Sequence, residues 1–89
     1  MTERPEPGEI AEAVLRLCAA RGPEKSICPS EVARALIKDL DEWRELMPSV
    51  RAVAADLHRC GKISILQGGC EVDPQSAKGP IRLAIPRKR

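Results

Sequence analysis

The residues of this sequence best suited to covalent chemistry are its four cysteines, Cys18, Cys28, Cys60 and Cys70. Cys28 stands directly before Pro29 in the stretch ICPSEVARAL, at the predicted start of a short helix. Because a helix N-terminus favours a thiolate, Cys28 is the one cysteine with a specific reason to be reactive. A nucleophile also needs a base, and the only histidine, His58, falls on a different predicted helix. The sequence therefore predicts that the protein is not an enzyme, and Cys28 stays open as a reactive thiol or a capping or buried residue.

The spacing of these cysteines gives little support to metal or cofactor chemistry. Structural zinc sites usually draw their ligands from close CxxC pairs, whereas these four are scattered singly. The sequence also lacks a glycine-rich phosphate loop, an HExxH motif and a recognisable carboxylate pair. Cys18 and Cys60 lie on apolar faces of predicted helices, where free cysteine often serves as a small core residue. We predict no metal and no cofactor, with a four-cysteine site assembled only by the fold as the alternative.

Composition places the chain among small globular domains. Its 89 residues suffice for one domain with a small core, and 43% of them are hydrophobic and 31% charged. Trp43 is the only aromatic side chain, which nearly excludes base stacking on aromatic platforms, as in many single-strand binders. No apolar run approaches the roughly 20 residues of a membrane helix, and residues 1–8 do not resemble a signal peptide. We expect a cytoplasmic protein with reduced thiols and no membrane contact.

Three helices are predicted in the first two thirds of the chain. The first covers residues 9–21, where apolar residues recur at helical spacing until a Gly-Pro pair ends the helix. A brief extended bridge at 25–27 leads to a second helix at 29–38, and a connector with a partial helical turn follows at 39–47. The third and clearest helix covers 48–60. Its predicted core face consists of Val50, Val53, Ala54 and Leu57.

Local signals indicate where these helices begin. The N-cap of the second helix is either Cys28 or Ser30. In the connector, Asp39 with Glu42 three residues later resembles a capping box. The residue before a proline is disfavoured from helical angles, so we expect the third helix to begin at Pro48 and not before it.

After the third helix the pattern changes from helix to strand. Residues 62–65 alternate polar and apolar, and the Gly-Gly pair at 68–69 offers a two-residue hairpin turn because both glycines accept positive φ. A short return strand is predicted at 70–72, one possible helical turn at 73–79, and a last strand at 81–85.

This order of elements predicts a mostly α protein with a small antiparallel sheet, of the α+β class. More specifically, it predicts a winged helix-turn-helix, in which three helices precede a β-hairpin wing. The predicted organisation is a flexible lead-in at residues 1–8, one domain at 9–85 and a basic tail at 86–89.

The same parts of the sequence resemble one protein family. The stretches KSICPSEVARAL, WRELMPSVRAVAADL, GKISIL, VDP and GPIRL are similar to the bacterial family catalogued as domain of unknown function 3253. The resemblance covers about residues 10–85 and implies a winged-helix-like fold in a cytoplasmic bacterial protein. It implies no established activity, substrate or catalytic residue.

Basic side chains are concentrated in the second half of the chain. The net charge is −3 over residues 1–48 and +5 over residues 49–89. Because Lys and Arg attract phosphates regardless of base sequence, we predict a DNA-binding module of low specificity, consistent with a transcription-related role. The third helix offers few side chains for base readout. The predicted phosphate contacts are Arg51, Arg59, Lys62, Lys78, Arg82, Arg87, Lys88 and Arg89.

A protein-interaction or dimerisation module is the alternative, because the same scaffold serves both uses. Ala52 and Ala55 on the outer face of the third helix would allow close approach by another helix. Trp43 would be a natural anchor for a partner if it were exposed, whereas a lone tryptophan more often covers the core. The sequence names neither a DNA site nor a protein partner.

Overall fold

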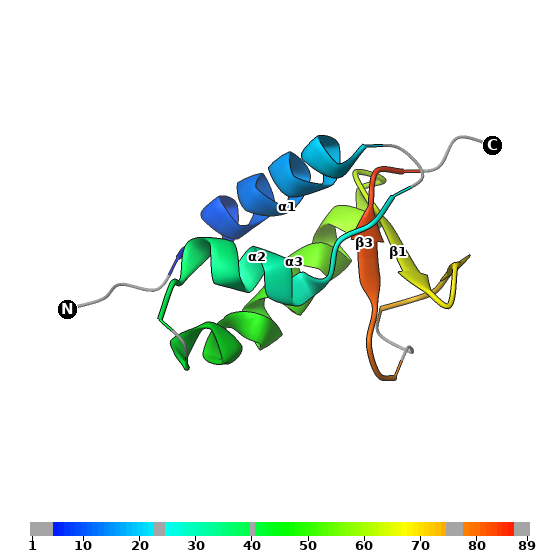
Figure 1. The fold of residues 1–89 in the computed structure, drawn as a ribbon. Helices are drawn as coiled ribbons and strands as arrows, with labels where there is room; N and C mark the ends of the chain where they lie inside the picture. The colour runs from blue at the N-terminus through cyan, green and yellow to red at the C-terminus, as the bar shows by residue number, and fades with distance from the viewer. Residues whose placement is uncertain (1–4, 23–24, 40, 75–77, 87–89) are drawn as a thin grey trace.

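The structure is a computed structural model that describes residues 5–22, 25–39, 41–74 and 78–86. Within these ranges three helices pack together, and a three-stranded antiparallel sheet lies at one end of them (Figure 1). The predicted α+β class, with three helices preceding a small antiparallel sheet, is confirmed.

Helix α1 (Pro7–Arg21) begins two residues before its predicted start. The reason is a cap: the Glu9 carboxylate accepts a hydrogen bond from the Glu6 backbone N–H at 3.2 Å, and proline fits the first turn because no N–H is needed there. The predicted end is confirmed, since Gly22 follows the helix with a φ of 94° that glycine adopts readily. The buried residues of the helix are Ile10, Ala13, Val14 and Cys18.

Helix α2 (Pro29–Leu36) has Cys28 as its N-cap, one of the two predicted caps. The helix ends two residues before the predicted position because Ile37 adopts an extended backbone, with φ −125° and ψ 112°. A β-branched side chain favours such angles, and the extended turn lets Ile37 pack against the core. The short helix is held by the burial of Val32 and Ala33.

A 3-10 helix, η1 (Glu42–Leu46), occupies the connector ahead of α3. The Asp39 carboxylate accepts hydrogen bonds from the backbone N–H groups of Asp41, at 2.9 Å, and Glu42, at 3.1 Å. These bonds favour the charged carboxylate and lower the pKa of Asp39 from its ordinary value of 3.8. The Asp39 side chain thus makes one of the two hydrogen bonds of the predicted capping box, the one from the Glu42 N–H, and turns the chain into η1.

Helix α3 (Met47–Arg59) begins one residue earlier than predicted. Met47 has helical angles, φ −54° and ψ −45°, although Pro48 follows it. The chain enters α3 directly from η1, and burial of Leu46, which is 1% exposed, holds it in this geometry against the steric preference. The predicted core face is confirmed by the burial of Val50, Val53, Ala54 and Leu57.

The sheet consists of β1 (Ser64–Gln67), β2 (Cys70–Glu71) and β3 (Arg82–Ala84), in the order β2-β1-β3. Both neighbours of β1 run antiparallel to it. The predicted two-residue turn between β1 and β2 is confirmed, with φ of 61° at Gly68 and 84° at Gly69. Strands β2 and β3 are each shorter than predicted.

The predicted extended bridge before α2 joins this sheet beside β3. The Ile27 N–H donates to the Leu83 carbonyl, and the Leu83 N–H donates to the Ile27 carbonyl, each at 2.8 Å. Strand β3 therefore lies between β1 and the segment that links α1 to α2, as Figure 1 shows. This pairing fixes the start of α2 relative to the end of the domain.

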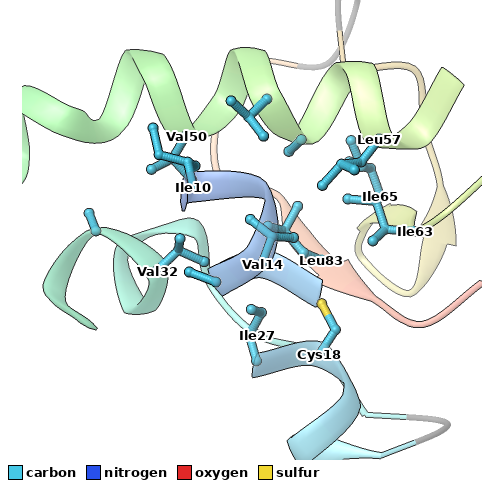
Figure 2. Close-up of a cluster of buried hydrophobic side chains, with 14 of the residues drawn as sticks. Ile10, Val14, Cys18, Ile27, Val32, Val50, Leu57, Ile63, Ile65 and Leu83 are labelled. Atoms are coloured by element: carbon cyan, nitrogen blue, oxygen red, sulfur yellow. The ribbon is translucent and has the colours of Figure 1, made fainter. Parts of the chain in front are cut away.

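The core is built almost entirely from aliphatic side chains, because the sequence has no Phe and no Tyr. Figure 2 shows side chains from the three helices and the sheet meeting in one cluster. Branched side chains fill such a small interior without polar atoms that would need partners. The labelled members are Ile10, Val14, Cys18, Ile27, Val32, Val50, Leu57, Ile63, Ile65 and Leu83.

Replacing Leu83 by alanine tests the junction between the sheet and the helices. Leu83 is completely buried, so we expect L83A to lower the free energy of unfolding by about 2–5 kcal/mol through lost burial and an unfilled cavity. Urea denaturation followed by circular dichroism measures this loss. The half-buried Ile85 provides a matched control, and equal losses in L83A and I85A would contradict the structure.

Candidate nucleic-acid interface

The side of α3 opposite its core face forms a surface that we call the α3 outer face, consisting of Arg51, Ala52, Ala55 and Arg59. Ala52 and Arg59 are exposed, and Arg51 and Ala55 are partly exposed. Burial of the opposite side of the helix positions this outer face. Small side chains at its centre leave room for another molecule to approach the helix backbone.

A groove of about 290 Å³ adjoins this face at Ala55 and Arg59, and we call it the α3 groove. One wall comes from α3 and the other from the segment that follows β2. The groove is lined by Ala55, His58, Arg59, Asp73 and Pro74. The fold therefore brings the outer side of α3 and the chain leaving the hairpin to one concave surface.

Three of the eight predicted phosphate contacts are available for binding. Arg51 is partly exposed on α3, Lys62 is exposed just after α3, and Lys78 is exposed ahead of β3. Among the residues that the structure describes, none of these three side chains forms a hydrogen bond or ion pair. Their charges are free for an anion, although only Arg51 belongs to the α3 outer face.

Two further predicted contacts already have partners within the chain. Arg59 pairs with Asp56 one turn earlier on α3, and both side chains are 66% exposed, so this ion pair contributes little to stability. Arg82 donates from Nε to the Ser26 hydroxyl at 2.6 Å and from its terminal nitrogen to the Ser26 carbonyl at 3.0 Å. The Arg82 side chain thus ties β3 to the segment ahead of α2, a structural role that its charge did not suggest.

The remaining predictions for this surface fall partly outside the described residues. Arg87, Lys88 and Arg89 lie beyond residue 86, the last one that the structure describes. The predicted helical turn at 73–79 includes residues 75–77, which are also outside the described ranges. The predicted phosphate contacts at residues 87–89 and the predicted turn through residues 75–77 therefore remain predictions.

All four cysteines carry free thiols, but their surroundings differ from the predictions at one position. Cys60 is exposed, so the prediction that it is a core residue is wrong. Helix α3 ends at Arg59, and the backbone then turns through Gly61 with a positive φ of 74°, which carries Cys60 away from the core face. Cys70, at the start of β2, is also exposed.

Cys28 takes part in a hydrogen-bonded helix start. Its backbone N–H donates to the Glu31 carboxylate at 2.7 Å, and its sulfur accepts a hydrogen bond from the Ser30 hydroxyl at 3.1 Å. Glu31 also pairs with Arg21 of α1 at 2.7 Å. Of the roles left open by the sequence, this geometry favours the capping role, because each polar group around Cys28 serves the junction of α1 and α2.

Cys18 is a core residue, as predicted, and is 2% exposed. Burial raises the pKa of its thiol to about 11 from an ordinary value of 9.0, and the negative charge of Glu31 adds to the shift. A neutral thiol suits this position among aliphatic side chains.

One group of cations was missed by the sequence reasoning. Arg34, Lys38 and Arg44 gather around Trp43 in the half of the chain that has a net negative charge. In the helix predicted to run to residue 38, Arg34 and Lys38 would share one side because they are four residues apart, but α2 ends at Leu36 and that signal does not apply. The tertiary approach of η1 was not visible in the sequence.

The pH dependence of stability tests the buried state of Cys18. The folded protein holds the thiol proton more tightly than the unfolded chain does, so the contribution of Cys18 is complete below pH 9 and is lost as the pH rises towards 11. We expect the stability advantage of the wild type over C18A to shrink across this range in urea denaturation. A constant difference between the wild type and C18A across this range would contradict this assignment.

No helix among the described residues is long and apolar enough to cross a membrane. Over the same part of the chain, no group of three or more His, Cys, Asp or Glu side chains is placed to hold a metal ion.

A search of curated proteins finds no match. The chain does match a family described as "Protein of unknown function (DUF3253)" over residues 7–86, which run from the start of α1 to beyond β3. The resemblance seen in the sequence is thereby confirmed, and the chain belongs to the DUF3253 family.

Proposed function

We propose that this domain binds duplex DNA with low sequence specificity, as a winged helix in which α3 enters the major groove and the β1–β2 hairpin acts as the wing. The order of three helices, hairpin and final strand supports this proposal, because the third helix is the usual groove reader in such folds. Fold alone does not fix a function, and the surface that α3 presents is therefore considered next to the fold.

The observation that carries the proposal is the α3 groove. A recognition helix needs one side held by the core and the other open to the DNA, with the wing beside it. Here the α3 outer face borders the segment that leaves the hairpin, and the two enclose about 290 Å³. Ala52 and Ala55 keep the centre of this face low enough for the helix backbone to approach a groove.

The side chains of α3 favour low specificity. Reading a base edge requires an arginine, asparagine or glutamine that is free to reach it. On the α3 outer face Arg51 is free to do so, Arg59 would first have to leave its exposed ion pair with Asp56, and the other positions are alanines. Asp56 also brings a negative charge that opposes close approach of phosphates. Binding would therefore come mainly from phosphate contacts.

The salt dependence of binding to a short DNA duplex tests this proposal. Three free cations, together with the three of the basic tail, correspond to about three to six phosphate contacts, so log K should fall against log salt with a slope of about −3 to −5. Fluorescence anisotropy of a labelled duplex measures this slope. Absence of binding at low salt would overturn the proposal.

Two arginine variants separate binding from folding. We expect R51A to weaken binding about three- to tenfold and to reduce the salt slope by about 1, without loss of stability. R82A should instead leave the slope unchanged and lower the free energy of unfolding by about 1 kcal/mol, because it removes the bonds to Ser26. Arg16, exposed on α1, is the control for a general charge effect. A slope reduced equally by R51A and R16A would contradict the assignment of α3 as the binding surface.

A further inference from the structure

A second concave surface lies away from α3, at the C-terminal end of α2 and the start of η1. It encloses about 500 Å³, and we call it the Trp43 pocket. Its lining residues are Arg34, Ile37, Lys38, Trp43 and Arg44. It shares no residue with the α3 groove, so the two surfaces can be occupied independently.

Two guanidinium groups stand over the indole ring of Trp43. The distance from the guanidinium carbon to the ring centroid is 4.5 Å for Arg34 and 5.3 Å for Arg44, within the range of a cation–π contact. Across the described part of the chain, neither guanidinium forms a hydrogen bond or an ion pair. A guanidinium that lies over a ring still directs its N–H groups outward in its own plane. The indole thus holds two sets of donors in place with their hydrogen-bonding capacity unused.

The pocket combines these charges with apolar contact. Trp43 and Ile37 are partly buried and pack against the core, whereas Arg34, Lys38 and Arg44 are exposed around them. A ligand that fits both features carries a carboxylate or other oxyanion next to an apolar group. Bidentate pairing with arginine adds geometric selection for such planar anions.

We propose that the Trp43 pocket docks an acidic segment of a partner protein, in which a Glu or Asp side chain pairs with Arg34 and Arg44 and a neighbouring apolar side chain packs on Ile37. Charge complementarity and the partly buried floor of the pocket support this occupant. The inference is independent of DNA binding by α3, and it gives a specific site to the protein-interaction class that the sequence left open.

The surroundings of the pocket favour a peptide over nucleic acid. A base that stacked on Trp43 would have to displace guanidiniums that already cover the ring. The apolar side chain of Ile37 also offers a contact for an apolar group of a peptide, and a sugar–phosphate backbone has no such group.

Fluorescence of Trp43, the only tryptophan, reports directly on this site. The probe is a blocked hexapeptide that alternates Glu and Leu side chains, and the matched control peptide has Gln in place of Glu. We expect a saturable change in emission with the Glu peptide and about tenfold weaker binding of the Gln peptide, because the charge-assisted hydrogen bonds are lost.

Variants of the full chain identify the groups that bind. The double variant R34A/R44A should bind the Glu peptide about tenfold or more weakly, whereas R34K/R44K should recover only part of the affinity because lysine lacks the planar fork. R16A, at an exposed arginine of α1 outside both surfaces, should stay within about twofold of the wild type. Arg34 and Arg44 are exposed, and thermal unfolding of each variant checks that the fold is kept.

Three results would overturn the inference. The first is equal binding of the Glu and Gln peptides, or no saturable change with either at millimolar concentration. The second is full recovery of affinity in R34K/R44K together with an equal loss in R16A, which would indicate a diffuse charge effect. The third is displacement of the Glu peptide by a short DNA duplex in the wild type but not in R34A/R44A, which would assign the pocket to nucleic acid.

Discussion

The paired backbone hydrogen bonds between Ile27 and Leu83 hold the two ends of this domain together. Both residues are buried, so these polar groups have little access to water and depend on each other. The pairing places β3 between β1 and the linker ahead of α2, and Arg82 reinforces it through Ser26. Helix α2 begins at Pro29, two residues after Ile27, so this single junction sets how the helices pack on the sheet. The aliphatic cluster of Figure 2 then fills the space between them.

Features set by local periodicity could be predicted, whereas features set by tertiary approach could not. The core face of α3 and the Gly-Gly turn followed from spacing and from the conformational freedom of glycine. The helical angles of Met47 did not, because burial of the preceding Leu46 overrides a local steric preference. Cys60 shows the same limit at the other end of α3, where one further residue of predicted helix would have placed an exposed thiol in the core.

The role of each charged side chain was hardest to predict, because whether it is paired or free depends on residues far away in the sequence. Counting basic residues treated Arg82 and Arg51 alike, yet Arg82 is tied to Ser26 and Arg51 is free. The same count directed attention to the basic half of the chain and away from Trp43, where cations from α2 and η1 meet in the acidic half. The result is a domain with two separate surfaces, the α3 groove for the proposed DNA contact and the Trp43 pocket for the proposed acidic partner.

The most direct test of DNA binding at the α3 outer face is a nuclear magnetic resonance titration, in which amide chemical shifts of the labelled protein are followed as a short DNA duplex is added. We predict that DNA shifts the amides of Arg51, Ala52, Ala55 and Lys62 most. The amides of Arg34, Trp43 and Arg44 should stay nearly unchanged. Shifts confined to the Trp43 pocket, or spread evenly over α1 and the α3 outer face, would contradict the division of the molecule into these two surfaces.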